Sequence, residues 1–300
     1  MAQRKQTQRK RPTGTKRKQK NEHTFLKLIG IALLAVLVVA AILAFTQKDA
    51  PLVKSIKERF TFTRTETTRA TIAQTDSLEY VIIPDGMQEE IAEYAGYRVS
   101  FNPDYRIPNY VVYELTREET KGTVSRSDDF SEDRNVRNCP DESAYRHSGY
   151  DRGHMAPAAD MKWSEEAMSE SFYMTNMCPQ AKALNRGAWK DLEEKARDWA
   201  QRDSAIVIVA GPLMDERPQR LESGVAVPDG FFKVILSPYT TPARGIAFVY
   251  KNEGGQKRME QQAVTIDHVE EITGFDFFST LPDDIEVQIE KNCNFNEWNN

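Results

Sequence analysis

An uncharged apolar run divides this chain into two parts that face different surroundings. The run LIGIALLAVLVVAAILAF covers residues 28–45, close to the roughly 20 residues with which a helix crosses a hydrocarbon core of about 30 Å. The 27 residues before it carry ten Lys or Arg and one acid. Dense positive charge on one side of a spanning helix stays in the cytoplasm. The sequence therefore predicts a basic cytoplasmic tail at 1–27, a membrane anchor at 28–45 and export of everything that follows.

A cleaved secretory signal is the competing interpretation of the same segment. Val39, Ala40 and Ala41 form a small-residue pattern that a signal peptidase accepts. The apolar core of a signal peptide is usually shorter than this run, and its basic region is shorter too. These lengths favour the uncleaved anchor, with secretion as the alternative.

The exported part divides into a linker and one acidic domain. Residues 46–77 are polar, rich in Thr and without sustained periodicity, which is typical of a linker. Residues 78–300 have the size of a single domain. After residue 27 the chain has 30 basic and 44 acidic residues, a formal net charge of about −14. Cys139, Cys178 and Cys293 could form one disulfide in any of three pairings and lack the spacing of a zinc site.

Apolar patterns within the domain indicate both strands and helices. The segment 184–203 places Trp189, Leu192, Ala196 and Trp199 on one stripe of an amphipathic helix. A shorter helix is predicted at 265–274, with Gly274 as its stop. Short runs of β-branched and aromatic residues predict strands at 109–116, 205–211, 231–237 and 245–251. The pattern predicts a sheet with helices interspersed.

The stretch YDRGHMAP, residues 150–157, combines an acid, an arginine, a glycine and a histidine. In an extended segment Arg152 and His154 share one face, Asp151 lies on the other, and Gly153 allows close backbone approach. A neutral imidazole can take a proton from water near neutral pH, and a guanidinium suits a phosphate. Taken alone, His154 is more often a structural histidine.

A second group of polar residues follows at Asn176, Asn185 and Glu193. On one continuous helix, Asn185 and Glu193 lie about 80° apart around the axis and two turns along, so both can border one site. An amide oxygen and a carboxylate suit a hard cation such as Mg²⁺. The plainer interpretation makes Asn185 a helix cap and pairs Glu193 with Arg197 on the surface.

Three segments together resemble a known family. YDRGHMAPAAD (150–160), TNMCPQ (175–180) and LNRGAWKDLEE (184–194) are similar to motifs of the DNA/RNA non-specific endonucleases, the ββα-metal nucleases of the endonuclease G type. Weaker similarity extends over most of residues 97–290. The resemblance implies an α+β fold with a central, largely antiparallel sheet flanked by helices. It also implies cleavage of DNA and RNA with Mg²⁺, Mn²⁺ or another divalent cation, and homodimers are common in the family.

The resemblance also implies roles for individual residues. His154 matches the general base that activates water, Asn185 the direct metal ligand, and Glu193 the residue that holds metal-bound water. Asn176 matches a residue that supports the site. Arg152 matches the motif arginine near the phosphate, and Arg126, in GTVSRSDDF, matches a further arginine through a looser alignment.

The acidic balance of the domain argues against a nucleic-acid partner, because phosphate binding draws on basic surfaces. Net charge does not locate charges, however, and several arginines lie near the proposed site in sequence. A local positive groove is therefore expected from Arg126, Arg134, Arg137, Arg146, Arg152 and Arg186.

The function predicted from these observations is a membrane-anchored, exported nuclease for DNA and RNA. A non-enzymatic nucleic-acid-binding module of the cell envelope is the alternative from another class, because a fold does not fix function. A phosphodiesterase for small nucleotides is the enzymatic alternative. A base and a metal ligand together favour an enzyme over a binding module.

Overall fold

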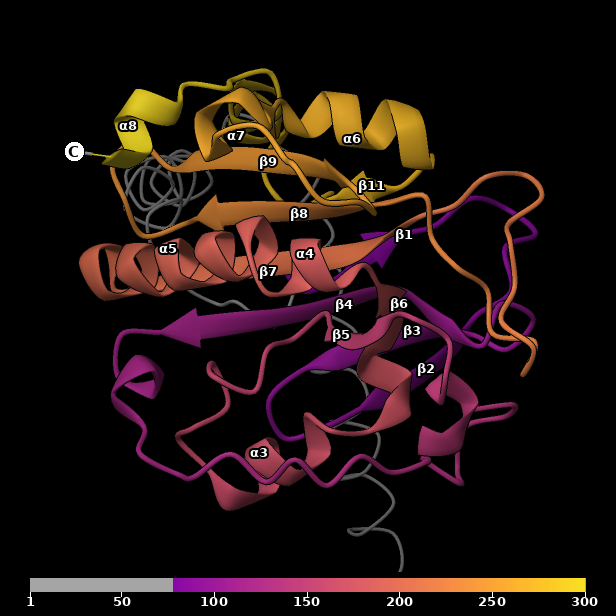
Figure 1. Ribbon diagram of the computed structural model, residues 1–300. Helices are drawn as coiled ribbons and strands as arrows, with labels where there is room; N and C mark the ends of the chain where they lie inside the picture. Colours follow the sequence, from indigo (N-terminus) through magenta and orange to yellow (C-terminus); the bar gives the residue numbers. More distant parts are fainter. Residues whose placement is uncertain (1–77, 300) are drawn as a thin grey trace, which may run out of the picture. The chain divides into compact units, whose positions relative to one another are not determined.

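A seven-stranded sheet forms the centre of the protein (Figure 1). The computed structural model describes residues 78–299. The strand order is β10-β9-β8-β7-β4-β3-β2, and every neighbouring pair is antiparallel. The predicted α+β class with a central antiparallel sheet is confirmed. The strands of this sheet are β2 (Glu90–Glu93), β3 (Arg98–Asn102), β4 (Ile107–Thr116), β7 (Ala205–Leu213), β8 (Gly230–Ser237), β9 (Arg244–Lys251) and β10 (Ala263–Val264).

The sheet is covered on both faces, which explains why its central strands are apolar without alternation. Successive strand residues point to opposite faces. In β7, Ile206 and Ile208 join the core under one helical layer, whereas Val207 and Val209 join the core under the other. An antiparallel sheet with one solvated face would alternate apolar and polar residues instead. The four strands predicted from such runs correspond to β4, β7, β8 and β9.

Helix α5 (Ala188–Asp203) covers the first face and contacts β4 and β7. The predicted stripe of Trp189, Leu192, Ala196 and Trp199 is buried in its core. The predicted helix over 184–203 is wrong at its beginning, because the chain forms a separate short helix, α4 (Lys182–Asn185), before α5. Figure 1 shows the two helices in succession along the sheet.

Gly187 makes the interruption between α4 and α5. Its backbone has φ −119° and ψ −112°, outside the helical region. A Cβ at this position would lie 2.7 Å from the carbonyl oxygen of Ala183. Asn185 therefore ends α4 while Glu193 lies inside α5, and the predicted angle of about 80° between them on one helix does not apply.

Helices α6 (Ile266–Thr273) and α7 (Asp283–Glu290) lie on the second face and contact β9. Thr265 caps α6 by accepting a hydrogen bond from the backbone N–H of His268, and Gly274 ends it in the left-handed conformation (φ 73°). The predicted helix and its stop are confirmed. The other strands and α-helices of the described residues are β1 (Val81–Ile82), β5 (Asp151–His154), β6 (Met177–Gln180), β11 (Asp276–Phe277), α3 (Glu165–Glu170) and α8 (Phe295–Asn299).

The predicted tail, anchor and linker, residues 1–77, lie outside the described residues. Among residues 78–299 no helix combines the length and apolar character that a membrane span requires. All three cysteines are free thiols, with Cys139 and Cys178 buried. The disulfide allowed by the sequence is therefore not formed in this structure.

Candidate active site

Two short strands and two helices build the site apart from the main sheet. Strand β5 pairs antiparallel with β6, and α4 and α5 follow β6 directly. Gly153 in β5 pairs with Cys178, and a Cβ at Gly153 would lie 2.3 Å from Oε1 of Gln180. The close approach predicted for this glycine is thus present. The β5–β6–α4–α5 arrangement places the DRGH motif beside Asn185.

A cavity of about 530 Å³ opens at this arrangement. Three of the predicted site residues, Arg126, Arg152 and Asn185, are part of its lining. Its four arginines outnumber its two acids, so the cavity is locally positive within an acidic chain. Of the six arginines expected in a groove, Arg134 and Arg137 do not line it. The lining consists of Arg126, Phe130, Glu142, Tyr145, Arg146, Tyr150, Asp151, Arg152, Asn185 and Arg186.

His154 lies behind this lining and is packed among aromatic rings. Its imidazole contacts Phe172 edge to face, with 5.0 Å between ring centroids, and Phe130 at 5.7 Å. The guanidinium of Arg152 lies 3.8 Å from the Phe130 ring centroid, and that of Arg126 lies 4.8 Å from the Phe172 centroid. Arg152 and His154 thus share a contact with Phe130, as expected for residues on one face of β5.

The surroundings of His154 keep the imidazole neutral. Burial, followed by the positive charge of Arg126, lowers the pKa of His154 to about 3, while Asp128 acts in the opposite direction. Among the described residues, Nε2 has no hydrogen-bond partner. A neutral imidazole with an unpaired ring nitrogen is the form that can accept a proton as a general base.

Asn185 is held by Asp151, which the sequence did not single out for a role. Nδ2 of Asn185 donates to Oδ2 of Asp151 at 3.0 Å. Arg186 donates to both carboxylate oxygens of Asp151, each at 2.8 Å. Although burial acts to raise it, these hydrogen bonds from Arg186 and Asn185 lower the pKa of Asp151. Asp151 is therefore ionised at neutral pH and orients the Asn185 amide.

This corner of the cavity fits a hard divalent cation. Because Nδ2 of Asn185 is engaged by Asp151, Oδ1 of Asn185 is the atom that can act as a ligand. A neutral amide oxygen beside one carboxylate is a small set of hard donors, which suits Mg²⁺ because this ion keeps several of its waters. The size of the cavity leaves room for those waters.

Asn176 supports the site from the interior and does not line the cavity. Its side chain is completely buried. Its Oδ1 accepts a hydrogen bond from the backbone N–H of Ala156, and its Nδ2 donates to the carbonyl oxygens of Ala156 and Ser171. All distances are 2.8–2.9 Å. Asn176 thereby fixes the chain two residues after His154.

Glu193 does not line the cavity either. It is half-buried on α5 and belongs to a charged network with Arg197 on the same helix and the buried Asp160 and Lys233. Burial raises the pKa of Glu193 to about 7; the charge of Asp160 acts the same way, and the charges of Lys233 and Arg197 oppose it. Arg197 donates to Asp160 at 2.7 Å, and the Tyr113 hydroxyl donates to the same carboxylate at 2.8 Å.

Lys233 on β8 is a member of this network that was not predicted from the sequence. It is completely buried, and its Nζ lies 4.6 Å from the Trp189 ring centroid. The only signal is one lysine inside the apolar run FFKVILS. Because Lys233 lies 40 residues beyond Glu193, the two charges come together only when α5 packs against the sheet.

Comparison with known proteins identifies the family of this chain. The profile of the DNA/RNA non-specific endonuclease family matches residues 74–284. Nuclease EXOG, mitochondrial, from Xenopus laevis is 33% identical over 216 residues, covering 65% of this chain and 60% of the relative. Nuclease 1, mitochondrial, from Schizosaccharomyces pombe is 35% identical over 214 residues, covering 62% and 65%. The chain therefore spans somewhat less than two thirds of these curated relatives.

A solved structure shares the fold. The crystal structure of an EndoG/EndoGI complex contains a chain that matches with a TM-score of 0.60 and 28% identity, covering 65% of this chain and 88% of that one. The family profile covers well over half of the sequence and includes β5, β6, α4 and α5. The chain therefore belongs to the DNA/RNA non-specific endonuclease family.

Proposed function

We propose that this protein is a divalent-metal-dependent nuclease that hydrolyses phosphodiester bonds of DNA and RNA. The observation that carries the proposal is the neutral His154, whose Nε2 has no hydrogen-bond partner among residues 78–299. Burial and the charges of Arg126 and Arg152 lower its pKa, and both arginines line the same cavity as Asn185. A proton acceptor, a cation ligand and fixed positive charges are the groups that attack of water on a phosphodiester requires.

Each residue has a distinct part in the reaction. His154 removes a proton from the attacking water through Nε2, and Arg126 and Arg152 face the negative charge that grows on the phosphate oxygens. A divalent cation on Asn185 would supply further positive charge at the phosphate and lower the pKa of bound water. Asp151 keeps the Asn185 amide oriented, and Asn176 holds the chain after His154.

Substrate binding strengthens the base. The charges of Arg126 and Arg152 both lower the pKa of His154 in the free protein. A phosphodiester bound between these arginines neutralises part of that charge, so the pKa of His154 rises toward its ordinary value. The histidine therefore becomes a better proton acceptor when a phosphate is in place.

The residues that line the cavity favour recognition of the sugar-phosphate backbone of a nucleic acid over recognition of its bases. Its cationic groups are arginines, which recognise phosphate oxygens and carry no base sequence information by that contact. We therefore infer little sequence preference and activity on both DNA and RNA.

The compartment is a further part of the proposal. The basic tail and the apolar run at 28–45 support a single-pass anchor with the nuclease domain on the far side of the membrane. Protease digestion of intact cells or spheroplasts that express the full chain tests this topology. The domain should be degraded while the tail at 1–27 is protected; protection of the domain would contradict export.

His154→Ala in the full chain tests the activity. Loss of the base should lower the cleavage of plasmid DNA and of RNA by about 10²- to 10⁴-fold in the presence of Mg²⁺. A chelator should abolish cleavage by the unmodified chain. His268→Ala is the matched control, because His268 is exposed on α6, on the other face of the sheet.

The possible outcomes separate the competing functions. Cleavage by the unmodified chain alone supports the nuclease and its base. If the unmodified chain binds DNA and cleaves neither polymer, the fold serves recognition and the mechanism is wrong. If it hydrolyses small phosphodiesters and leaves polymers intact, the protein is a nucleotide phosphodiesterase.

A further inference from the structure

A second cavity, the accessory cavity, borders the junction between α4 and α5. Its volume is about 330 Å³, and Ala183 of α4 and Ala188 of α5 form part of its wall. Asn185 and Arg186, which lie between these alanines in the sequence, line the DRGH-containing cavity. Arg186 and Ala188 are two residues apart, so their Cα atoms lie at most about 7 Å from each other. The accessory cavity is therefore a close neighbour of the candidate active site.

The loop that follows β9 forms another wall of the accessory cavity and is fastened in place. Oδ1 of Asn252 accepts a hydrogen bond from the backbone N–H of Ala181, just before α4, at 2.7 Å. Nε2 of Gln256 donates to two nearby backbone carbonyl oxygens at 2.9 and 2.7 Å. The next two residues, Lys257 and Arg258, line the cavity. Their backbone is thus held at a fixed place beside α4.

The charges around the accessory cavity favour an anion. Lys257 and Arg258 oppose a single acidic residue of the lining, Asp191. Arg258 forms an ion pair with Glu260, whereas no residue among 78–299 forms an ion pair or a hydrogen bond with the ammonium of Lys257. The described surroundings therefore leave the charge of Lys257 available to a ligand.

The beginning of α5 adds to this positive potential. The helix has 16 residues, and its N-cap, Gly187, offers no side chain to accept from the first backbone N–H groups. These groups carry the positive end of the helix dipole. The first helical residue, Ala188, is part of the cavity wall.

Tyr250 on β9 gives an independent sign that a ligand is missing. Its side chain is 1% exposed, and its hydroxyl has no hydrogen-bond partner among the described residues. Tyr250 lines the accessory cavity. Burial and, after it, the charge of Asp191 raise the pKa of Tyr250, so the hydroxyl lies on the side of β9 where Asp191 lines the same cavity. A buried hydroxyl without a partner is costly, and an acceptor in this cavity would remove that cost.

We propose that the accessory cavity binds a phosphate of the substrate strand beside the scissile phosphodiester; this proposal rests on the proposed nuclease function. Lys257 and Arg258 contact the phosphate oxygens, and the Tyr250 hydroxyl donates to one of them. A duplex strand carries one phosphate for about every 3.4 Å of its axis. A phosphate about one to three nucleotides from the scissile one can therefore span the distance between the two cavities. Asp191 opposes the anion, but the two basic side chains and the beginning of α5 outweigh it.

Oligonucleotide binding by the full chain carrying His154→Ala tests the contact. Fluorescence anisotropy with a short labelled single strand, in Ca²⁺, should give a Kd about 10-fold higher when Lys257→Gln is added, the effect of losing one charge-assisted hydrogen bond. The slope of log binding constant against log salt concentration should fall in magnitude by about 0.7, the value for one phosphate of a single strand. Lys251→Gln is the matched control, because Lys251 is exposed and follows Tyr250 on β9, hence on the opposite face.

Tyr250→Phe separates ligand binding from folding. Because the hydroxyl has no partner among residues 78–299, its removal should leave the Tm without nucleic acid equal or higher. The same substitution should raise the Kd for the oligonucleotide about 3- to 10-fold. A hydroxyl that serves packing alone would leave the Kd unchanged.

Cleavage of the oligonucleotide by the unmodified chain is measured separately, so the two proposals fail independently. If the unmodified chain cleaves and Lys257→Gln binds as well as Lys251→Gln, the accessory contact is overturned and the nuclease function stands. If the unmodified chain does not cleave, the nuclease function fails, whereas a loss of affinity in Lys257→Gln and Tyr250→Phe still supports a phosphate contact in this cavity. A Tm increase with inorganic phosphate that Lys257→Gln abolishes, at unchanged Kd for the oligonucleotide, would assign the cavity to free phosphate and overturn the strand contact.

Discussion

The chemistry of His154 depends on its neighbours more than on the histidine itself. An exposed imidazole titrates near pH 6.5, whereas Phe130 and Phe172 enclose this one and two arginines stand beside it. The pKa of His154 falls to about 3. The folded protein therefore holds His154 neutral in a range where the unfolded chain binds a proton.

This difference makes stability depend on pH. Between pH 6.5 and about 3 the unfolded state binds more protons at His154, so the free energy of unfolding decreases as the pH falls. From pH 7 to pH 5 the contribution of His154 is a loss of about 2 kcal/mol. Denaturant unfolding at both pH values should show that His154→Gln loses less stability than the unmodified protein. Equal losses in the two proteins would mean that His154 titrates normally.

Asp151 is expected to control metal affinity through Asn185. Asp151→Asn removes the charge that Arg186 and Asn185 share, so the amide loses its fixed orientation. The Mg²⁺ concentration for half-maximal cleavage should rise about 10- to 100-fold, the usual effect of losing a group that orients a metal ligand. Asn185→Ala should raise the Mg²⁺ concentration for half-maximal cleavage further, because it removes the ligand itself. Metal titrations of the variants measure both effects, and an unchanged midpoint for Asp151→Asn contradicts the role.

At the level of elements, the pattern of apolar and turn residues along the chain predicted the helices and strands that depend on local interactions. Apolar spacing and turn residues were sufficient to predict the apolar stripe of α5, the end of α6 at Gly274 and the four central strands. The break at Gly187 was not predicted, because one glycine inside a helical pattern is usually tolerated. The break lies at the non-helical backbone of Gly187. Likewise, Glu193 meets Lys233 only when α5 lies on β8, a relation that no spacing along the chain reveals.

The β5–β6 pair depends on the absence of a side chain at Gly153. In Gly153→Ala the new Cβ would lie 2.3–2.6 Å from atoms of Gln180, so the two strands must separate. Overpacking of this kind costs about 1–3 kcal/mol, a fall in Tm of roughly 3–10 °C for a domain of this size. Thermal unfolding should show that Gln180→Gly partly restores stability in the double variant. Additive losses would place the strain elsewhere.

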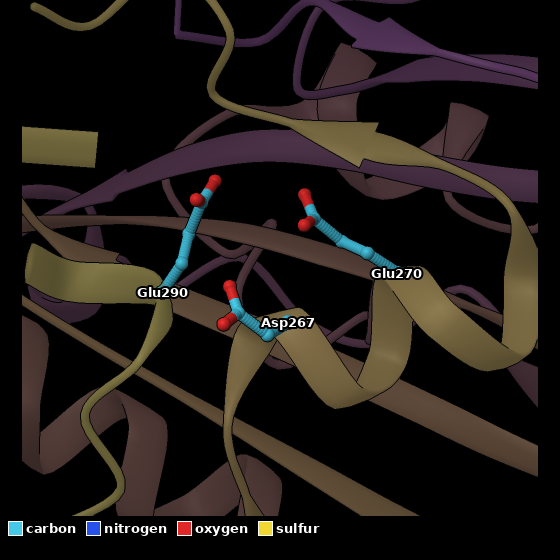
Figure 2. A group of neighbouring side chains, drawn as sticks. All are labelled: Asp267, Glu270 and Glu290. Carbon is cyan, nitrogen blue, oxygen red and sulfur yellow. The ribbon is translucent and has the colours of Figure 1, made fainter. Parts of the chain in front are cut away.

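For the whole molecule, one sheet separates two regions of opposite local charge. The cavity beside α4 and α5 gathers four arginines, whereas Asp267, Glu270 and Glu290 lie close together on α6 and α7 over the other face (Figure 2). The formal net charge of about −14 after residue 27 repels nucleic acid at long range, whereas the four arginines of the cavity attract it locally. The amino-acid composition predicted the negative net charge of the domain. Which arginines line the cavity depends on the folded structure.

Salt should therefore weaken substrate binding through a small number of arginine contacts. The slope of log binding constant against log salt concentration is about −0.9 for each duplex phosphate neutralised. Arg146→Gln removes a cavity arginine and should reduce the magnitude of this slope by about one unit. Arg134→Gln is the control, because Arg134 lies nearby in sequence and is exposed outside the cavity lining. Binding of duplex DNA, measured by fluorescence anisotropy in Ca²⁺ with the His154→Ala chain, avoids cleavage during the titration. If both substitutions change the slope equally, general surface charge governs binding and the cavity does not define the path of the phosphates.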